Sequence, residues 1–99
     1  MDAYLDIETT GLSQQTDELT VVGVFTDDGD GSTLTQLVGD EITGGRLLDT
    51  FQGVSSLYTF NGSRFDVPFI RSRLGVDLAK GLRHQDLMYD CWDRGLYGG

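Results

Sequence analysis

The start of the chain carries two acids whose spacing suggests metal chemistry. Asp6 and Glu8 lie two positions apart, and the apolar Leu5 and Ile7 beside them predict a β-strand. Residues two apart on a strand point to the same face, so the two carboxylates repel each other. A hard divalent ion such as Mg²⁺ or Mn²⁺ would stabilise that pair through its oxygen ligands. Two ordinary acids at a solvated strand end are the alternative.

A third acid, Asp66, stands between a predicted strand at 56–60 and a predicted helix at 66–74. Its residue type makes it a good helix N-cap, which is the simplest role for it. If the strand at 56–60 runs parallel to the strand at 3–8, the carboxyl ends of both strands lie at one edge of the sheet. Ligands of open α/β sheets bind at that edge, so we expect Asp66 to lie near the first acidic pair.

The elements that position these acids form one predicted α/β domain over residues 1–99. The predicted strands are 3–8, 18–26, 33–38 and 56–60, and the predicted helices are 42–53, 66–74 and 86–94. Residues 18–26 are apolar on both faces, which is typical of a strand near the centre of a sheet. A turn rich in Asp and Gly at 27–32 makes a hairpin. We therefore expect a mixed sheet with flanking helices, in which the first three strands are antiparallel and the fourth is parallel to the first.

The charge of the chain is unevenly distributed. The net charge is −9, and residues 1–45 hold ten acids and no Lys or Arg. Such acidity is a poor match for nucleic acid, although bound divalent ions would reverse the local sign. Five bases could form a basic rim or simply a solvated helix surface. They are Arg64, Arg71, Arg73, Lys80 and Arg83.

The sequence favours a cytoplasmic protein without membrane contact. Cys91 is the one cysteine, so no disulfide forms within the chain. No apolar run approaches the roughly 20 residues that cross a bilayer. Early acids also interrupt the segment where a signal peptide would have its basic and apolar regions.

Two segments of the sequence resemble a known family. Residues 4–12 (YLDIETTGL) and 61–69 (NGSRFDVPF) resemble the first two motifs of the DEDD 3′–5′ exonucleases of the ribonuclease H-like superfamily. The likeness is greatest to predicted exonucleases related to the proofreading domain of family B DNA polymerases, and residues 84–89 (HQDLMY) resemble that group as well. The resemblance implies a ribonuclease H-like fold and hydrolysis of single-stranded DNA or RNA from its 3′ end.

The resemblance also implies a role for each matching residue. Asp6, Glu8 and Asp66 would be catalytic and would hold Mg²⁺ or Mn²⁺, with two ions in the complete domain. The implied substrate-binding residues are Thr9, Thr10, Gly11, Leu12, Asn61 and Phe65. The first four would line the pocket of the terminal nucleotide. The last two would flank the nucleic-acid strand, where an aromatic ring stacks on a base without reading its identity.

The family pattern is not complete in this sequence. The family has a fourth carboxylate, an Asp on a C-terminal helix, with a Tyr or His near it. Tyr89 and Asp93 fit a Tyr-x-x-x-Asp spacing, but so short a pattern is permissive, and we assign Tyr89 to packing. We therefore expect a C-terminally incomplete domain that is weak or inactive by itself, with apolar surface that favours self-association through the incomplete sheet. The alternative is a non-catalytic metal- or nucleic-acid-binding module that keeps the fold.

Overall fold

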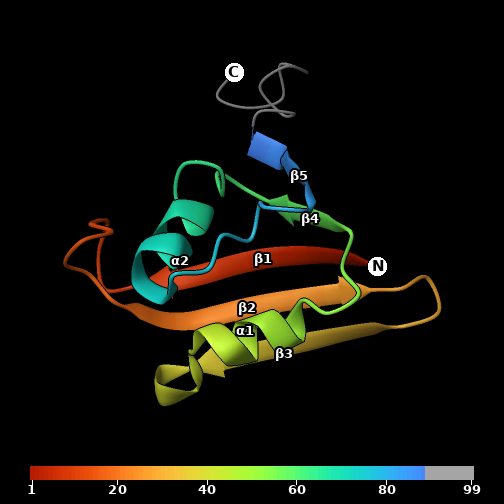
Figure 1. Cartoon of the computed structure of the whole chain (residues 1–99), viewed down its shortest axis with the longest axis horizontal. Helices are drawn as coiled ribbons and strands as arrows, with labels where there is room; N and C mark the ends of the chain where they lie inside the picture. Colours follow the sequence, from red (N-terminus) through yellow and green to blue (C-terminus); the bar gives the residue numbers. More distant parts are fainter. Residues whose placement is uncertain (89–99) are drawn as a thin grey trace.

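The computed structural model describes residues 1–88, and five strands of this region form one sheet (Figure 1). The strands are β1 (Asp2–Thr9), β2 (Leu19–Asp27), β3 (Ser32–Val38), β4 (Ser56–Thr59) and β5 (Arg83–Asp86). The helices are η1 (Gly39–Glu41, a 3₁₀ turn), α1 (Gly44–Thr50) and α2 (Asp66–Leu74). The order of strands across the sheet is β3-β2-β1-β4-β5, so β1 is central.

The pairing of the strands confirms the predicted mixed α/β sheet. β1 pairs antiparallel with β2, and β2 pairs antiparallel with β3 across the Asp- and Gly-rich hairpin. β4 returns after α1 and pairs parallel with β1. The carboxyl ends of β1 and β4 therefore share one edge of the sheet, as the sequence predicts.

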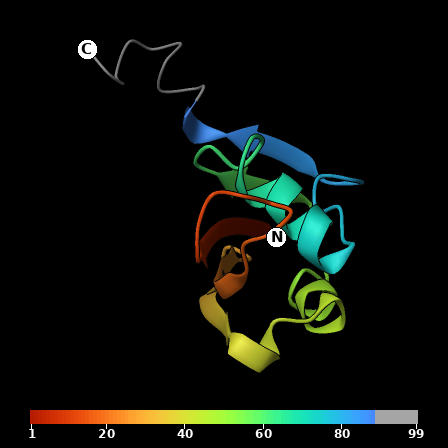
Figure 2. The ribbon, with the colours of Figure 1, turned by 90° about the vertical axis from the view of Figure 1, so that its left-hand side faces the viewer.

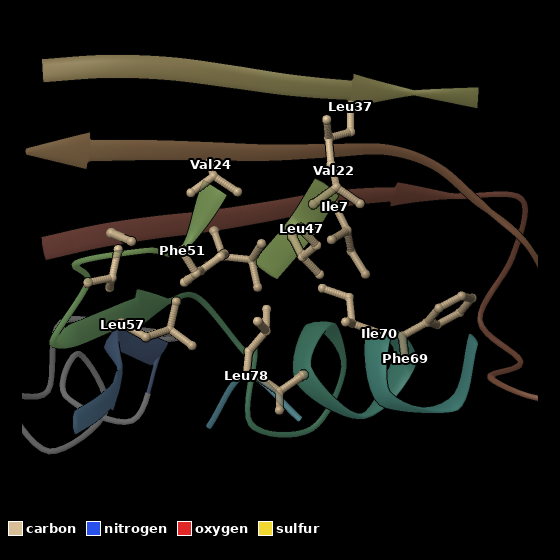
Figure 3. Packing of buried hydrophobic residues seen from close by; sticks show 14 residues of the cluster. Ile7, Val22, Val24, Leu37, Leu47, Phe51, Leu57, Phe69, Ile70 and Leu78 are labelled. Atoms are coloured by element: carbon tan, nitrogen blue, oxygen red, sulfur yellow. The ribbon is translucent and has the colours of Figure 1, made fainter. Parts of the chain in front are cut away.

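Both α-helices lie on the same face of the sheet, which we call the inner face (Figure 2). Alternating strand residues point into this layer, and Leu47, Phe51, Phe69 and Ile70 meet them from the helices and their ends (Figure 3). The inward residues of β1 are Ala3, Leu5 and Ile7, all buried. Tyr4, Asp6 and Glu8 point to the opposite, outer face, which no helix among residues 1–88 covers.

The structure differs from the predicted elements in two places. Residues 83–86 form the edge strand β5, which was not predicted, and the helix predicted at 86–94 begins only after this strand. Leu87 and Met88 are helical, and the rest of that predicted helix, with Tyr89 and Asp93, lies outside the described residues. The helix predicted at 42–53 is limited to α1, and η1 precedes it. Gly53, with a φ of 80°, follows α1 in a left-handed conformation that ends the helical path.

Within residues 1–88, no helix has the length and apolar character needed to span a membrane.

Candidate active site

The site lies where β4 stops and β1 continues beyond it. The pairing of β1 with β4 ends at Tyr4 opposite Tyr58. The chain then leaves β4 through a turn and enters α2 at Asp66, so this acid reaches the part of β1 that has no β4 partner. The structure thus brings Asp66 to the strand that carries Asp6 and Glu8.

Asp66 is one of the few buried polar residues of the described chain, with 6% of its surface exposed. Burial, and next the negative charge of Asp6, raise its pKa to about 7. The charge of Asp86 acts in the same direction with a smaller effect, whereas hydrogen bonds from the amides of Asp66 and Ile7 oppose the rise. The carboxyl group is therefore only partly ionised at neutral pH and would gain from a cation beside it.

The simple N-cap role predicted for Asp66 is wrong. α2 begins with Asp66 as its first helical residue, and Phe65 is the N-cap and makes no capping hydrogen bond with its side chain. The carboxylate instead turns toward β1, where the amide of Ile7 donates to it. A side chain there accepts from a strand amide and faces a second acid, which a cap does not require.

Asp6 and Glu8 are both exposed on the outer face of β1. The residue opposite Asp6 on β2 is Gly23, which has no side chain to fill the space beside the carboxylate. Opposite Glu8 stands Val21, and the pairing becomes irregular immediately after Glu8. The site is thus open on its β2 side.

The donor set suits a hard divalent ion in chemistry but is not gathered tightly. Within residues 1–88, no three Asp, Glu, His or Cys side chains come close enough together to form a metal-binding group. Asp6 and Asp66 are near enough for the charge of one to raise the pKa of the other. Glu8 shares the strand face of Asp6, so a bound cation would draw in a third oxygen donor by side-chain rotation.

The loop that follows β1 is built around Asp17, which sequence reasoning did not single out. Its carboxylate accepts from the hydroxyl of Thr10 (3.1 Å) and the amide of Ser13 (2.8 Å). Gly11 lies so close that a Cβ would stand 2.5 Å from the Asp17 carboxylate, so a larger residue there would displace that carboxylate. Thr9 donates to the carbonyl of Gly11 (2.7 Å). The loop is therefore internally braced.

The predicted substrate-binding residues lie in two places, the end of β1 with the loop that follows it and the turn between β4 and α2. The hydroxyls of Thr9 and Thr10 already bond within the loop, whereas Leu12 is 83% exposed. Asn61 adopts a left-handed conformation (φ 61°) in the turn before α2. Phe65 is half-buried and packs against Phe69, with ring centroids 5.5 Å apart. Phe65 thus has a packing role that the sequence pattern did not indicate.

The predicted basic rim is only partly available. Arg73 pairs with Glu18 and donates to the carbonyl of Gln15 (3.3 Å), so it braces the loop after β1. Arg71, Lys80 and Arg83 are exposed.

Two residues of β5 were not predicted as part of the site. Asp86 accepts hydrogen bonds from the turn between β4 and α2, and His84 bonds the buried hydroxyl of Thr59 (2.8 Å). The histidine is thus half-buried and bonds to another residue of the protein, in line with the packing or capping role that its sequence context favours. The resemblance of residues 84–89 to the exonuclease group was the one available signal for this pair.

The sequence profile of the RNase H superfamily matches residues 3–99. No curated protein matches the sequence. Product-bound exonuclease I is a similar solved structure, with a TM-score of 0.66, 16% identity, and coverage of 98% of this chain and 33% of that one. A metal-free complex of E. coli exonuclease I with single-stranded DNA has a TM-score of 0.60 and 15% identity over 98% of this chain and 31% of that one.

A family B DNA polymerase from the hyperthermophilic archaeon Pyrobaculum calidifontis is also similar. Its TM-score is 0.61 and its identity 18%, with coverage of 88% of this chain and 15% of the polymerase. The chain thus spans a third or less of these proteins. At such identities the likeness shows a shared fold, and the predicted ribonuclease H-like architecture is confirmed.

Proposed function

Because the chain belongs to the RNase H superfamily, we propose that it is part of a divalent-metal-dependent 3′–5′ exonuclease domain that hydrolyses single-stranded nucleic acid. Asp6, Glu8 and Asp66 would be its catalytic metal ligands. The solved relatives in fold include exonuclease I and a family B DNA polymerase, and one of these structures holds exonuclease I with single-stranded DNA. These names support the substrate class.

The observation that carries the proposal is the buried carboxyl group of Asp66 beside Asp6. A fold gains nothing in stability from burying an acid next to another acid, because both burial and the neighbouring charge disfavour the ionised form of the buried group. The pKa of about 7 for Asp66 expresses that cost. Perturbed carboxyl groups of this kind concentrate at functional sites.

Each residue of the proposed site would have a distinct role. Asp66 is held at the start of α2, whereas Asp6 and Glu8 are exposed and free to rotate toward a ligand. Bound Mg²⁺ or Mn²⁺ would supply an activated water and stabilise the leaving oxygen of the phosphodiester. The braced loop after β1 would line the pocket of the terminal nucleotide with Thr9, Thr10, Gly11 and Leu12. Asn61 and Phe65 would flank the strand from the other side.

We expect the 99-residue chain by itself to be a weak nuclease. Three of the family's four carboxylates have an assigned counterpart here, and members of one catalytic unit are strongly non-additive. A metal- or nucleic-acid-binding module without catalysis is the second candidate. It is favoured by the open arrangement of the acids, of which no three form a metal-binding group within residues 1–88.

The test is thermal unfolding with and without millimolar MnCl₂, for the wild type, Asp6→Asn and Asp2→Asn. Asp2 is the matched control, since it lies on the same strand at the end remote from Asp66. We expect Mn²⁺ to raise the Tm of the wild type and of Asp2→Asn by about 4 °C or more. The rise should vanish in Asp6→Asn. Equal responses in all three proteins would contradict the metal site.

A second assay separates the two candidate functions. A 5′-labelled single-stranded DNA oligonucleotide is incubated with the protein and Mn²⁺, and the products are resolved by length. Progressive shortening from the 3′ end that depends on Asp66 supports the exonuclease. Metal binding without any shortening supports the non-catalytic module.

A further inference from the structure

The turn between β4 and α2 is held from outside by the edge strand β5. Two residues of β5, His84 and Asp86, make four hydrogen bonds to residues 59–63. We propose that Asp86, supported by His84, is a positioning residue that fixes this turn and thereby sets the place of Asp66. The inference rests on the proposed function for its catalytic meaning, because Asp66 matters to chemistry only if it binds a metal.

Asp86 makes the larger share of these contacts. One of its carboxylate oxygens accepts from the amides of Asn61 (2.7 Å) and Met88 (3.1 Å). The other accepts from the amide (3.1 Å) and the hydroxyl (2.6 Å) of Ser63. Although burial alone would raise the pKa of Asp86, these hydrogen bonds together lower it. The side chain is therefore an ionised acceptor with both oxygens engaged.

His84 fixes the other side of the same turn. Its Nε2 lies 2.8 Å from the hydroxyl of Thr59, a residue only 2% exposed. Gly62 approaches Thr59 so closely that a Cβ would stand 2.3 Å from its side chain. The turn is thus pressed against a threonine that β5 holds in place, and Asn61 accepts a left-handed conformation there.

The residues between β4 and α2 are hydrogen-bonded directly to the start of α2. The amide of Val67 donates to the carbonyl of Gly62 (2.8 Å), and the amide of Phe65 donates to the carbonyl of Asn61 (3.0 Å). No side chain caps α2, so these backbone bonds are what orient its start. Asp66 lies between Phe65 and Val67, and its carboxylate follows their placement.

A second aspartate offers a control of the same chemistry. Asp28 accepts from the amides of Asp30 and Gly31 (2.9 Å each), which also lower its pKa. Its bonds stay within the hairpin between β2 and β3, whereas those of Asp86 bridge about 25 residues. Removing either acceptor destabilises a turn, but only Asp86 connects to Asp66.

The experiment compares Asp86→Ala, Asp86→Asn and Asp28→Ala in the 99-residue chain. The first readout is amide hydrogen exchange at Val67 and Asn61. Asp86→Ala should remove the protection of both amides, and Asp28→Ala should leave it intact. Asp86→Asn keeps one acceptor oxygen but presents an NH₂ group toward Ser63, so it should give an intermediate result and a folded protein.

The second readout is the Mn²⁺ dissociation constant by titration. It should rise roughly tenfold or more in Asp86→Ala, as for other residues that orient metal ligands, and stay at the wild-type value in Asp28→Ala. If Asp86→Ala and Asp86→Asn lose stability but keep Val67 protection, the inference is overturned. If no protein binds Mn²⁺, the proposed function fails, while the exchange experiment still decides whether Asp86 positions the turn.

Discussion

The two faces of the sheet differ although the same strands build them. On the inner face, alternate residues of β1 pack under α1 and α2 and are nearly or fully buried. On the outer face, the alternate residues of β1 are Asp2, Tyr4, Asp6 and Glu8, and Tyr4 remains 44% exposed. A strand alternates its side chains between faces, so one short segment can serve the core and the chemistry independently.

The outer face is not simply polar. Tyr4 stacks on Tyr58 (centroids 5.1 Å apart) and lies against Phe25 (6.1 Å). This aromatic row is adjacent to Asp6 along β1, because residues two apart share a face. The faces therefore differ mainly in whether helices cover them, and not in residue type alone. Substituting the same residue type on each face should separate the effect of burial on stability from the effect of residue type.

The largest expected contrast comes from truncating the same residue type on each face. Phe69 is fully buried under the inner face, whereas Phe25 is 40% exposed on the outer one. Phe69→Ala should lower the free energy of unfolding by about 3–5 kcal/mol, since it leaves a cavity. Phe25→Ala should cost about 1 kcal/mol, mostly from the lost aromatic contact. Urea unfolding measures both, and equal losses would mean that the outer face is as well packed as the core.

The next effect is a dependence of stability on pH, and it arises from the buried acid Asp66. The folded state raises the pKa of Asp66 from 3.8 to about 7, so it holds this proton more tightly than the unfolded chain. Stability of the metal-free protein should therefore fall as pH rises from about 4 to about 7, by up to about 4 kcal/mol.

Asp66→Asn should remove that slope and be the more stable protein at pH 8. Urea midpoints of wild type and variant at pH 5 and pH 8, without metal, measure the difference. A difference that does not change with pH would argue that the carboxyl group is ionised and well solvated in the folded protein.

A smaller effect should appear in a double-mutant cycle across the site. Asp6→Asn removes a like charge from Asp66, so the two substitutions should be coupled by roughly 0.5–2 kcal/mol at pH 8. Asp2→Asn, at the other end of β1, should show no coupling with Asp66→Asn. Equal coupling for Asp2 and Asp6 would indicate a general charge effect rather than a local site.

The smallest effect is expected at the ion pair of Arg73 and Glu18, which joins α2 to the loop between β1 and β2. Glu18 is exposed, so Glu18→Gln should cost only about 0.2–1 kcal/mol, and 1 M NaCl should reduce that cost further. Urea unfolding at low and high salt measures it. A loss of several kcal/mol would place the loop after β1 within the cooperative core.

Most of the fold could be predicted because it follows apolar periodicity. The alternation around Asp6 and Glu8 fixed β1, and the apolar segment after a crossover helix fixed the parallel β4. Residues 66–74 are the helix that their pattern predicts. The proximity of Asp66 to Asp6 followed from the same logic, since parallel strands end at one edge.

The strand β5 could not be predicted from periodicity. Its sequence, Arg-His-Gln-Asp, has no apolar residue, because its inward side chains meet polar partners rather than the core. The burial of Asp66 was hidden for a related reason. An aspartate at a helix start is usually a cap, and only the early end of β4 gives it a strand amide to bind instead.

That early end of β4 has a consequence for how the site would be observed. The amide of Ile7 is satisfied by a side chain where a neighbouring strand would otherwise supply a carbonyl. The side-chain carboxylate of Asp66 can rotate away from this amide without breaking the hydrogen bonds between strands. The environment of the Ile7 amide proton therefore depends on the position and charge of Asp66. The NMR resonance of the Ile7 amide should therefore report both the ionisation of Asp66 and the binding of a cation by Asp66, without labelling or substitution.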